Sequence, residues 1–306
     1  MRRPVAGALA VLLAVSVWGS ATVIIRFVDH VDGLVLGFHR LWIGMVATVV
    51  VFYATGRRVN RHNLRLAIPG GLAFSADLIL YFSAVKRTTI ADATVVGALQ
   101  PALMMLVAGP MFGEAVTFGL VVWSVVAMLG VAVAMYGSSG APVWSISGDL
   151  MAVGALFAWT GYFIFSKRVR REVPPFEYLT EMMIVAVVAV APFALLSGQR
   201  IDPGGADAWA WIALLAIGSG GVGHLLINWA HDHVELTVMS LLTLAIPIFA
   251  SVSAVLFLDE SMSFVQVLGM AIVIAALAVV VLMSTRDAGE PVTVAPSSLV
   301  EAELSE

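Results

Sequence analysis

The feature that most constrains this chain is a series of ten apolar segments, each about as long as a bilayer is thick. A helix needs about 20 apolar residues to cross the hydrocarbon core. Runs of this length lie between charged residues or Pro/Gly breaks at 5–27, 33–54, 66–85, 90–112, 116–136, 147–166, 176–197, 208–230, 235–258 and 263–284. We therefore predict an all-α membrane protein of ten transmembrane helices joined by short connections.

Composition agrees with this class. Hydrophobic residues make up 60% of the 306 residues and charged residues only 12%, more apolar side chain than one soluble core can bury. The sparse Lys and Arg exclude a nucleic-acid surface. The absence of cysteine excludes disulfides, thiolate metal sites and a cysteine nucleophile. The first apolar run extends to Phe27, beyond the core of a signal peptide, so we interpret it as the first span.

Basic residues predict the orientation. With ten spans, one side of the bilayer receives Arg2, Arg3, Arg57, Arg58, Arg61, Arg65, Lys167, Arg168, Arg170, Arg171 and Arg286, and the other receives Arg26, Lys86, Arg87 and Arg200. Because basic residues are retained in the cytoplasm, we expect both termini to be cytoplasmic, in a plasma (inner) membrane. The polar residues 285–306 predict a disordered cytoplasmic tail.

The two halves of the chain repeat one another. At an offset of 141 residues Trp18 matches Trp159 and Arg26 matches Lys167, and at 146 residues Pro101 matches Pro247 and Glu114 matches Glu260. The expected units are 5–136 and 147–284, with five helices each. Five is an odd number, so the second copy must be inverted in the bilayer. Inverted repeats are typical of secondary transporters, whose substrate site lies between the halves near the midplane.

The chain also resembles a known family. Trp18-Gly19-Ser20, and the stretch from Ala84 through Pro101 to Gly113-Glu114 with its second copy ending at Asp259-Glu260, resemble the EamA-type branch of the drug/metabolite transporter superfamily. The resemblance covers about residues 5–284 and implies two EamA repeats that export a small metabolite or drug. The family is unspecific in substrate. Ala115 stands where the family often has a basic or polar residue, so the first copy departs slightly from the pattern.

Ionisable residues inside the spans are costly in hydrocarbon and are candidates for function. Arg40 and Asp77 are expected at matching depth near one mouth of the pathway, and Glu181 and His224 near the other. Such pairs suit alternating gates or a proton relay. The alternative is that Arg40 and Asp77 form a structural ion pair, and that Glu181 or His224 extends toward an interface.

Other candidates for the substrate pathway are aromatic or amide side chains: Trp18, Trp159, Gln100 and Asn228. Glycine and proline predict helix breaks at matching places in the two halves, namely at Pro69, Gly70, Gly71, Pro101, Gly218, Gly220, Gly221 and Pro247. Close helix packing through small residues is the alternative for the glycines. Glu114 and Glu260 are expected to favour the N-termini of the helices that follow them, with Thr117 and Ser263 as caps.

We predict a carrier of a small molecule that works by alternating access and is either proton-coupled or facilitative, with no other cofactor and no metal. A multi-pass channel would need rings of selectivity groups. An intramembrane enzyme would use Ser219 and His224, but the glycine expected two residues before the serine is missing. His231-Asp232-His233 is interpreted as a solvated loop. No phosphate-binding loop is present, and the oligomeric state stays open.

Overall fold

The computed structural model describes residues 3–139 and 145–287, and within these ranges the regular structure is entirely helical. The first half forms α1 (Arg3–Arg26), α2 (Gly33–Ala54), α3 (Arg61–Val85), α4 (Ile90–Gly97), α5 (Gln100–Phe112) and α6 (Phe118–Ser139). The second half forms α7 (Ile146–Val169), α8 (Pro175–Leu195), α9 (Ala206–Leu215), a π-helical segment (Ala216–Gly223), α10 (His224–Ala230), α11 (Leu236–Leu242), a 3₁₀ turn (Thr243–Ala245), α12 (Ile246–Leu258) and α13 (Phe264–Asp287).

These elements make ten candidate membrane spans in the described residues, which confirms the number predicted from the sequence. The fourth span is α4 and α5 together, the eighth runs from α9 to α10, and the ninth joins α11 to α12. The last helix continues to Asp287, so residues 285–287 belong to this helix and not to the predicted tail. The rest of the tail lies outside the described residues.

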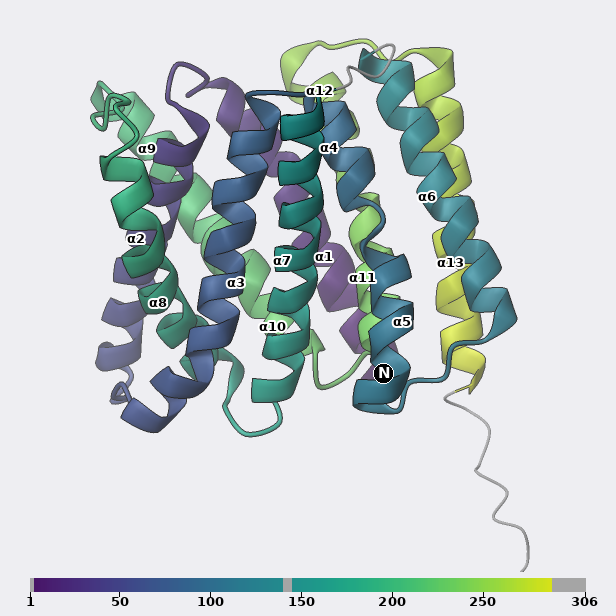
Figure 1. Ribbon diagram of the computed structural model, residues 1–306, viewed down its shortest axis with the longest axis horizontal. Coiled ribbons are helices and arrows are strands. Elements are labelled where there is room, and N and C mark those ends of the chain that lie inside the picture. Colours follow the sequence, from purple (N-terminus) through teal and green to yellow (C-terminus); the bar gives the residue numbers. More distant parts are fainter. Residues whose placement is uncertain (1–2, 140–144, 288–306) are drawn as a thin grey trace, which may run out of the picture.

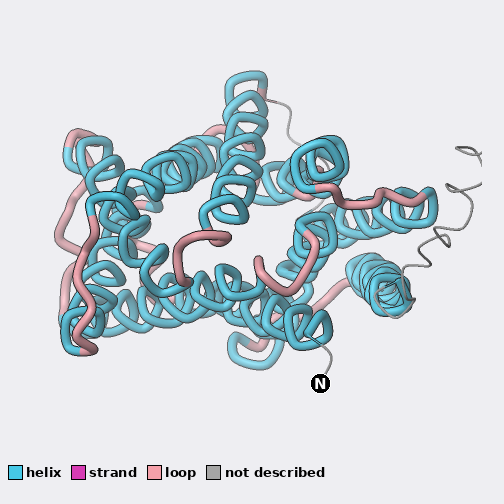
Figure 2. Tube along the Cα trace, turned by 90° about the horizontal axis from the view of Figure 1, so that it is seen from below, coloured by secondary structure: helices cyan, strands magenta, loops and turns pink. Residues whose placement is uncertain are grey.

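The second half is inverted relative to the first. In Figure 1, α1 rises from the N-terminus at the bottom of the bundle, whereas α7 descends from the top. The N-terminus and the end of α13 therefore lie at the same end of the bundle, which we call the termini end. Figure 2 looks along the bundle from this end and shows the helices side by side, with the N-terminus at one edge of the bundle.

Local chemistry fixes where helices begin and end. Asp32 caps α2 by accepting from Leu34 N–H, and Asn60 caps α3 by accepting from His62 N–H, as short polar side chains do. At the other boundary, Gly113 and Asp259 hold left-handed φ angles of 73° and 54°. These two residues are repeat-related, so both copies leave the broken helix through the same turn.

Packing between the halves is uneven along the bundle. At the termini end α5 packs against α11, whereas the equivalent pair at the opposite end, α4 and α12, is not packed together. Extensive contacts join α3 to α7, α1 to α12 and α6 to α13. The α5–α11 contact at the termini end therefore has no counterpart between α4 and α12, although α1 packs on α12 and α7 on α4 at the opposite end.

The outer surface of the bundle is apolar, as lipid contact requires. Leu106, Val188 and Leu129 expose 71%, 69% and 60% of their surface. Exposed apolar residues in such number are a feature of the membrane class, and the core proper is continuous across both repeats.

One predicted helix break is wrong. The structure contradicts an interruption at Pro69, Gly70 and Gly71, because α3 runs unbroken through all three. Tight packing explains the glycines instead: a Cβ on Gly71 would lie 2.7 Å from the Val185 side chain on α8, and Gly70 faces the Tyr178 hydroxyl. The helix tolerates Pro69, since neighbouring helices hold it in place.

Candidate functional site

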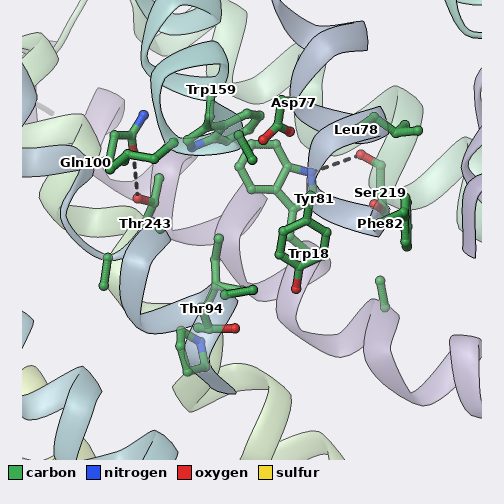
Figure 3. A pocket seen from close by; sticks show the side chains of 18 of the residues that line it. Trp18, Asp77, Leu78, Tyr81, Phe82, Thr94, Gln100, Trp159, Ser219 and Thr243 are labelled. Atoms are coloured by element: carbon green, nitrogen blue, oxygen red, sulfur yellow. Dashed lines mark hydrogen bonds between the residues drawn. The ribbon is translucent and has the colours of Figure 1, made fainter. Parts of the chain in front are cut away.

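A cavity of about 380 Å³ lies between the repeats, in the half of the bundle away from the termini. It reaches from the middle of the bundle to Ile25 and Phe82, in the last turns of α1 and α3. Helices from both halves line it, and most of its wall is apolar (Figure 3). Its polar lining comes from Arg40, Asp77, Thr94, Gln100, Ser219, His224 and Thr243.

The repeat-related tryptophans meet at the middle of the bundle and line this cavity. The Trp18 and Trp159 rings contact edge-on, with centroids 5.7 Å apart. Trp18 Nε1–H donates to the Ser219 carbonyl at 3.0 Å (Figure 3). Gly223 packs directly against the Trp18 ring, where a side chain would collide. The pair therefore presents a fixed aromatic surface to whatever occupies the cavity.

Arg40 and Asp77 share the cavity without forming a direct ion pair. No Arg40–Asp77 contact within 4.0 Å occurs among the ion pairs of the described residues. Arg40 Nη1 donates to Ser219 Oγ at 3.3 Å, and its Nε–H has no acceptor. A cation and a carboxylate thus line one hollow with hydrogen-bonding capacity left for a solute.

The two broken spans face each other at the cavity. In the first, the helix stops between Gly97 and Gln100 and resumes with Pro101 in its first turn; in the second, a 3₁₀ turn precedes Pro247. Thr243 Oγ1 donates to Gln100 Oε1 at 3.4 Å across the gap (Figure 3), while Gln100 Nε2 has no acceptor. Gln100 thus joins the predicted site residues in the lining.

The expected break at Gly218, Gly220 and Gly221 takes another form. The chain does not stop but widens into π-helical turns over Ala216–Gly223. Such turns are frequent at functional sites. Here the segment brings Ser219 and His224 to the cavity wall.

His224 is not near Glu181, contrary to the sequence prediction. Its ring lies among Trp18, Phe74 and Trp159, with Nδ1 3.1 Å from the Tyr162 hydroxyl. Between the His224 ring and the termini end, a layer of buried side chains closes the bundle, and we call this layer the plug. The plug contains Tyr162, Phe163, Ser166, Tyr178 and His231. The cavity is therefore closed at its termini end.

Glu181 and Asn228 lie outside the cavity lining. Glu181 is fully buried, and its Oε1 accepts from Asn60 N–H at 3.1 Å, so it holds the turn that precedes α3. Asn228 is also fully buried, and its backbone carbonyl accepts a hydrogen bond from Arg170 Nε. In this conformation both residues belong to the closed end of the bundle, and their prediction as pathway residues is not realised at the cavity.

Glu114 binds a partner that the sequence did not predict. It does not cap the following helix, whose first turn is bonded by Thr117. It crosses instead to the second repeat, where it accepts from the N–H groups of Leu236 and Thr237 at 2.6 and 3.0 Å. Lys167 Nζ lies 3.8 Å from Glu114 Oε1. The only sequence signal was the repeat itself, which relates both residues to Arg26 and Glu260.

Two other polar clusters, at His231 and at Ser219 with His224, were weighed in the sequence as a metal site and as a catalytic pair. Among the described residues, no group of three or more His, Cys, Asp or Glu side chains is placed to hold a metal ion. His231 is buried in the plug, so its interpretation as part of a solvated loop is wrong, and burial, followed by nearby Lys167 and Arg170, lowers its pKa. Ser219 Oγ accepts from Arg40 and His224 faces Tyr162, so these two residues do not form a nucleophile–base pair.

The inverted repeats, the broken helices and the shared central cavity are the architecture of a membrane transporter. The chain belongs to the EamA-like transporter family, whose family model matches residues 5–136 and 146–282. This confirms the family resemblance and the two-repeat fold, and indicates a transporter rather than an enzyme.

Named relatives and one solved structure agree. The chain is 24% identical over 212 residues to an aromatic amino acid exporter, YddG, of Ancylobacter novellus, covering 67% of this chain and 72% of the relative. It is 26% identical to a probable amino-acid metabolite efflux pump of Salmonella typhimurium, covering 87% and 91%. A crystal structure matches 94% of this chain and 99% of its own with a TM-score of 0.83 at 21% identity, which supports the fold.

Removing the Tyr162 hydroxyl is expected to weaken the plug. In Tyr162→Phe the buried His224 Nδ1 loses its partner, so the free energy of unfolding should fall by about 1 kcal/mol. Thermal unfolding in detergent measures this change. Tyr53→Phe is the matched control, because Tyr53 is 54% exposed. An equal loss of stability in both variants would contradict the role of the Tyr162–His224 contact.

Proposed function

We propose that the protein exports a small amphipathic zwitterion, such as an amino acid, by alternating access. The observation that carries the proposal is the one-sided cavity: it is lined by both repeats, extends toward one end of the bundle, and is closed by the plug at the other. A channel needs a path through both ends at once, whereas a carrier exposes its site to one end at a time.

The chemistry of the lining supports this class of substrate. Arg40 can bind an anionic group, Asp77 a cationic group, and Trp18 and Trp159 an apolar or aromatic portion. The volume of about 380 Å³ falls in the range of small-molecule sites. The two relatives named as an aromatic amino acid exporter and a probable amino-acid metabolite efflux pump support an amino acid and the direction of export.

The orientation belongs to the same proposal. The distribution of basic residues supports a plasma (inner) membrane location with the termini end facing the cytoplasm. The cavity would then face outward in the conformation described. Reporter fusions in the loops at Gly56 and Gly198 test this, with the first expected in the cytoplasm and the second outside. The reverse result would overturn the orientation.

Counterflow tests the transport mechanism itself. Proteoliposomes preloaded with an unlabelled amino acid should transiently accumulate the labelled form, and the flux should saturate. The substrate can be chosen by comparing metabolites released from cells that lack or overproduce the protein. Saturable counterflow supports the carrier, while linear flux without counterflow would replace it with a channel.

Proton coupling and facilitation are the two remaining possibilities for the driving force. Asp77 and His224 are ionisable groups at the cavity and are candidates for a proton site. An imposed pH gradient should drive net accumulation if protons are coupled. If the carrier only facilitates transport, the gradient should leave the final distribution unchanged.

A further inference from the structure

Two repeat-related glutamates occupy different environments at the two ends of the bundle. Glu114 follows α5 after the left-handed residue Gly113, and Glu260 follows α12 after the left-handed residue Asp259. The same backbone turn thus delivers each carboxylate. Because the repeats are inverted, Glu114 lies at the termini end and Glu260 at the opposite end.

At the termini end, Glu114 forms a closed contact between the repeats. Its two oxygens accept from Leu236 N–H, Thr237 N–H and the Thr237 hydroxyl at 2.6 to 3.0 Å. Lys167 adds a cation at 3.8 Å, and the Lys167 and Glu114 side chains are only 16% and 6% exposed. The contact ties the end of α5 to the start of α11, on the side where these two helices pack together.

At the opposite end the equivalent contact is open. The Glu260 carboxylate lies 2.9 Å from the Arg26 guanidinium. The Arg26 side chain is 62% exposed and the Glu260 side chain 45%. Ile90 and Ala91, at the offset of 146 from Leu236 and Thr237, start α4. Within the described part of the chain, no side chain accepts from their N–H groups, and α4 and α12 are parted here.

We propose that Glu114 and Glu260 are alternating locks of the transport cycle, which rests on the alternating access proposed above. When the termini end opens, Glu114 leaves α11. Glu260, accompanied by Arg26, then binds the N–H groups of Ile90 and Ala91 and closes α4 against α12. Each carboxylate stabilises one closed end through charge-assisted bonds to a helix N-terminus. The contact of Glu260 with α4 replaces the contact of Glu114 with α11, so the conformations open at either end stay close in free energy.

The natural absence of cysteine allows a direct test on purified protein in lipid nanodiscs. Thr94→Cys in the cavity lining reports access from the opposite end, and Ser166→Cys in the plug reports access from the termini end. The measurement is the rate of reaction with a charged maleimide. Glu114→Ala should slow labelling at 94 and speed it at 166, each about fivefold or more, since charge-assisted bonds are lost.

Glu260→Ala should do the reverse, raising labelling at 94 and lowering it at 166. A merely structural contact would not produce this, because Glu260 is exposed and Arg26 is the one partner of its carboxylate among the described residues. The double variant should return both rates toward wild type, which a folding defect cannot do. Glu172→Ala, an exposed acidic residue near the termini end, is the control and should change neither rate.

If both single variants shift the labelling rates in the same direction, or if neither variant shifts them, the proposal of alternating locks is wrong. If Glu114→Ala does not fold, Glu260→Ala decides alone by the direction of its shift. The labelling uses no substrate, so it stays separate from the transport assay. If counterflow occurs but neither variant changes the labelling rates, only the proposed locks are wrong. If the two variants shift labelling in opposite directions but no counterflow occurs, only the proposed substrate is wrong and the locks stand.

Discussion

Asparagine in place of Asp77 is expected to lower the transport rate about tenfold or more while leaving the amount of protein in the membrane unchanged. Asp77 lines the cavity together with Arg40, and no hydrogen bond or ion pair links its carboxylate to another described residue. Its charge is therefore available to the solute or to a proton. A bond to a charged group contributes about 1.5–3 kcal/mol, which corresponds to roughly tenfold or more in binding. The isosteric amide keeps the shape and removes the charge.

The measurement is initial counterflow rate against substrate concentration in proteoliposomes with equal amounts of reconstituted protein. Asp207→Asn is the matched control, because Asp207 is exposed at the start of α9 and lies outside the cavity lining. If Asp77→Asn folds, reconstitutes and transports at the wild-type rate, Asp77 has no part in the mechanism. The cavity would then recognise its substrate without the carboxylate.

The fold follows from the sequence because one physical term dominates it. A run of about 20 apolar residues has few alternatives to a membrane helix, so all ten spans could be placed within a few residues. The repeat offset also matched Trp18 with Trp159, and both tryptophans line the cavity, where their rings meet. The broken helices at Pro101 and Pro247 follow from the missing N–H of proline.

The site was harder to predict because depth alone does not place a side chain. Counting residues along a helix gave similar depths to Glu181 and His224. A helix turns once every 3.6 residues, however, so residues of equal depth can face different neighbours. Glu181 faces the Asn60 turn and His224 faces Tyr162. The direction of each face depends on how the helices pack, and one sequence does not give this.

The sequence also did not predict that equivalent residue pairs of the two repeats have different environments. Lys167–Glu114 and Arg26–Glu260 are equivalent pairs by offset, but only the first is buried against a helix N-terminus. A sequence encodes both ends of the cycle at once, whereas a structure shows one state. Comparing the closed contact at Glu114 with the open contact at Glu260 therefore indicates which contacts change during the transport cycle.

Alanine in place of Gly269 is expected to lower the free energy of unfolding by about 2–3 kcal/mol. The α6–α13 pair packs backbone to backbone: a Cβ on Gly269 would lie 2.7 Å from both the Ala134 Cα and the Gly130 carbonyl oxygen. Gly130 and Ala134 are four residues apart on α6, so they form one face of small residues that permits this approach. Because the obstacle is backbone rather than a movable side chain, the two helices must separate to admit the methyl group.

Gly161→Ala provides the matched comparison, since Gly161 also lies in a membrane helix but a Cβ there would meet its nearest neighbours at 3.8 Å. That variant should keep its stability or gain up to about 1 kcal/mol, because alanine favours the helix over glycine. Thermal unfolding of both variants in the same detergent measures the difference. Similar losses in both would mean that glycine serves the bundle generally, and that the α6–α13 contact has no special dependence on Gly269.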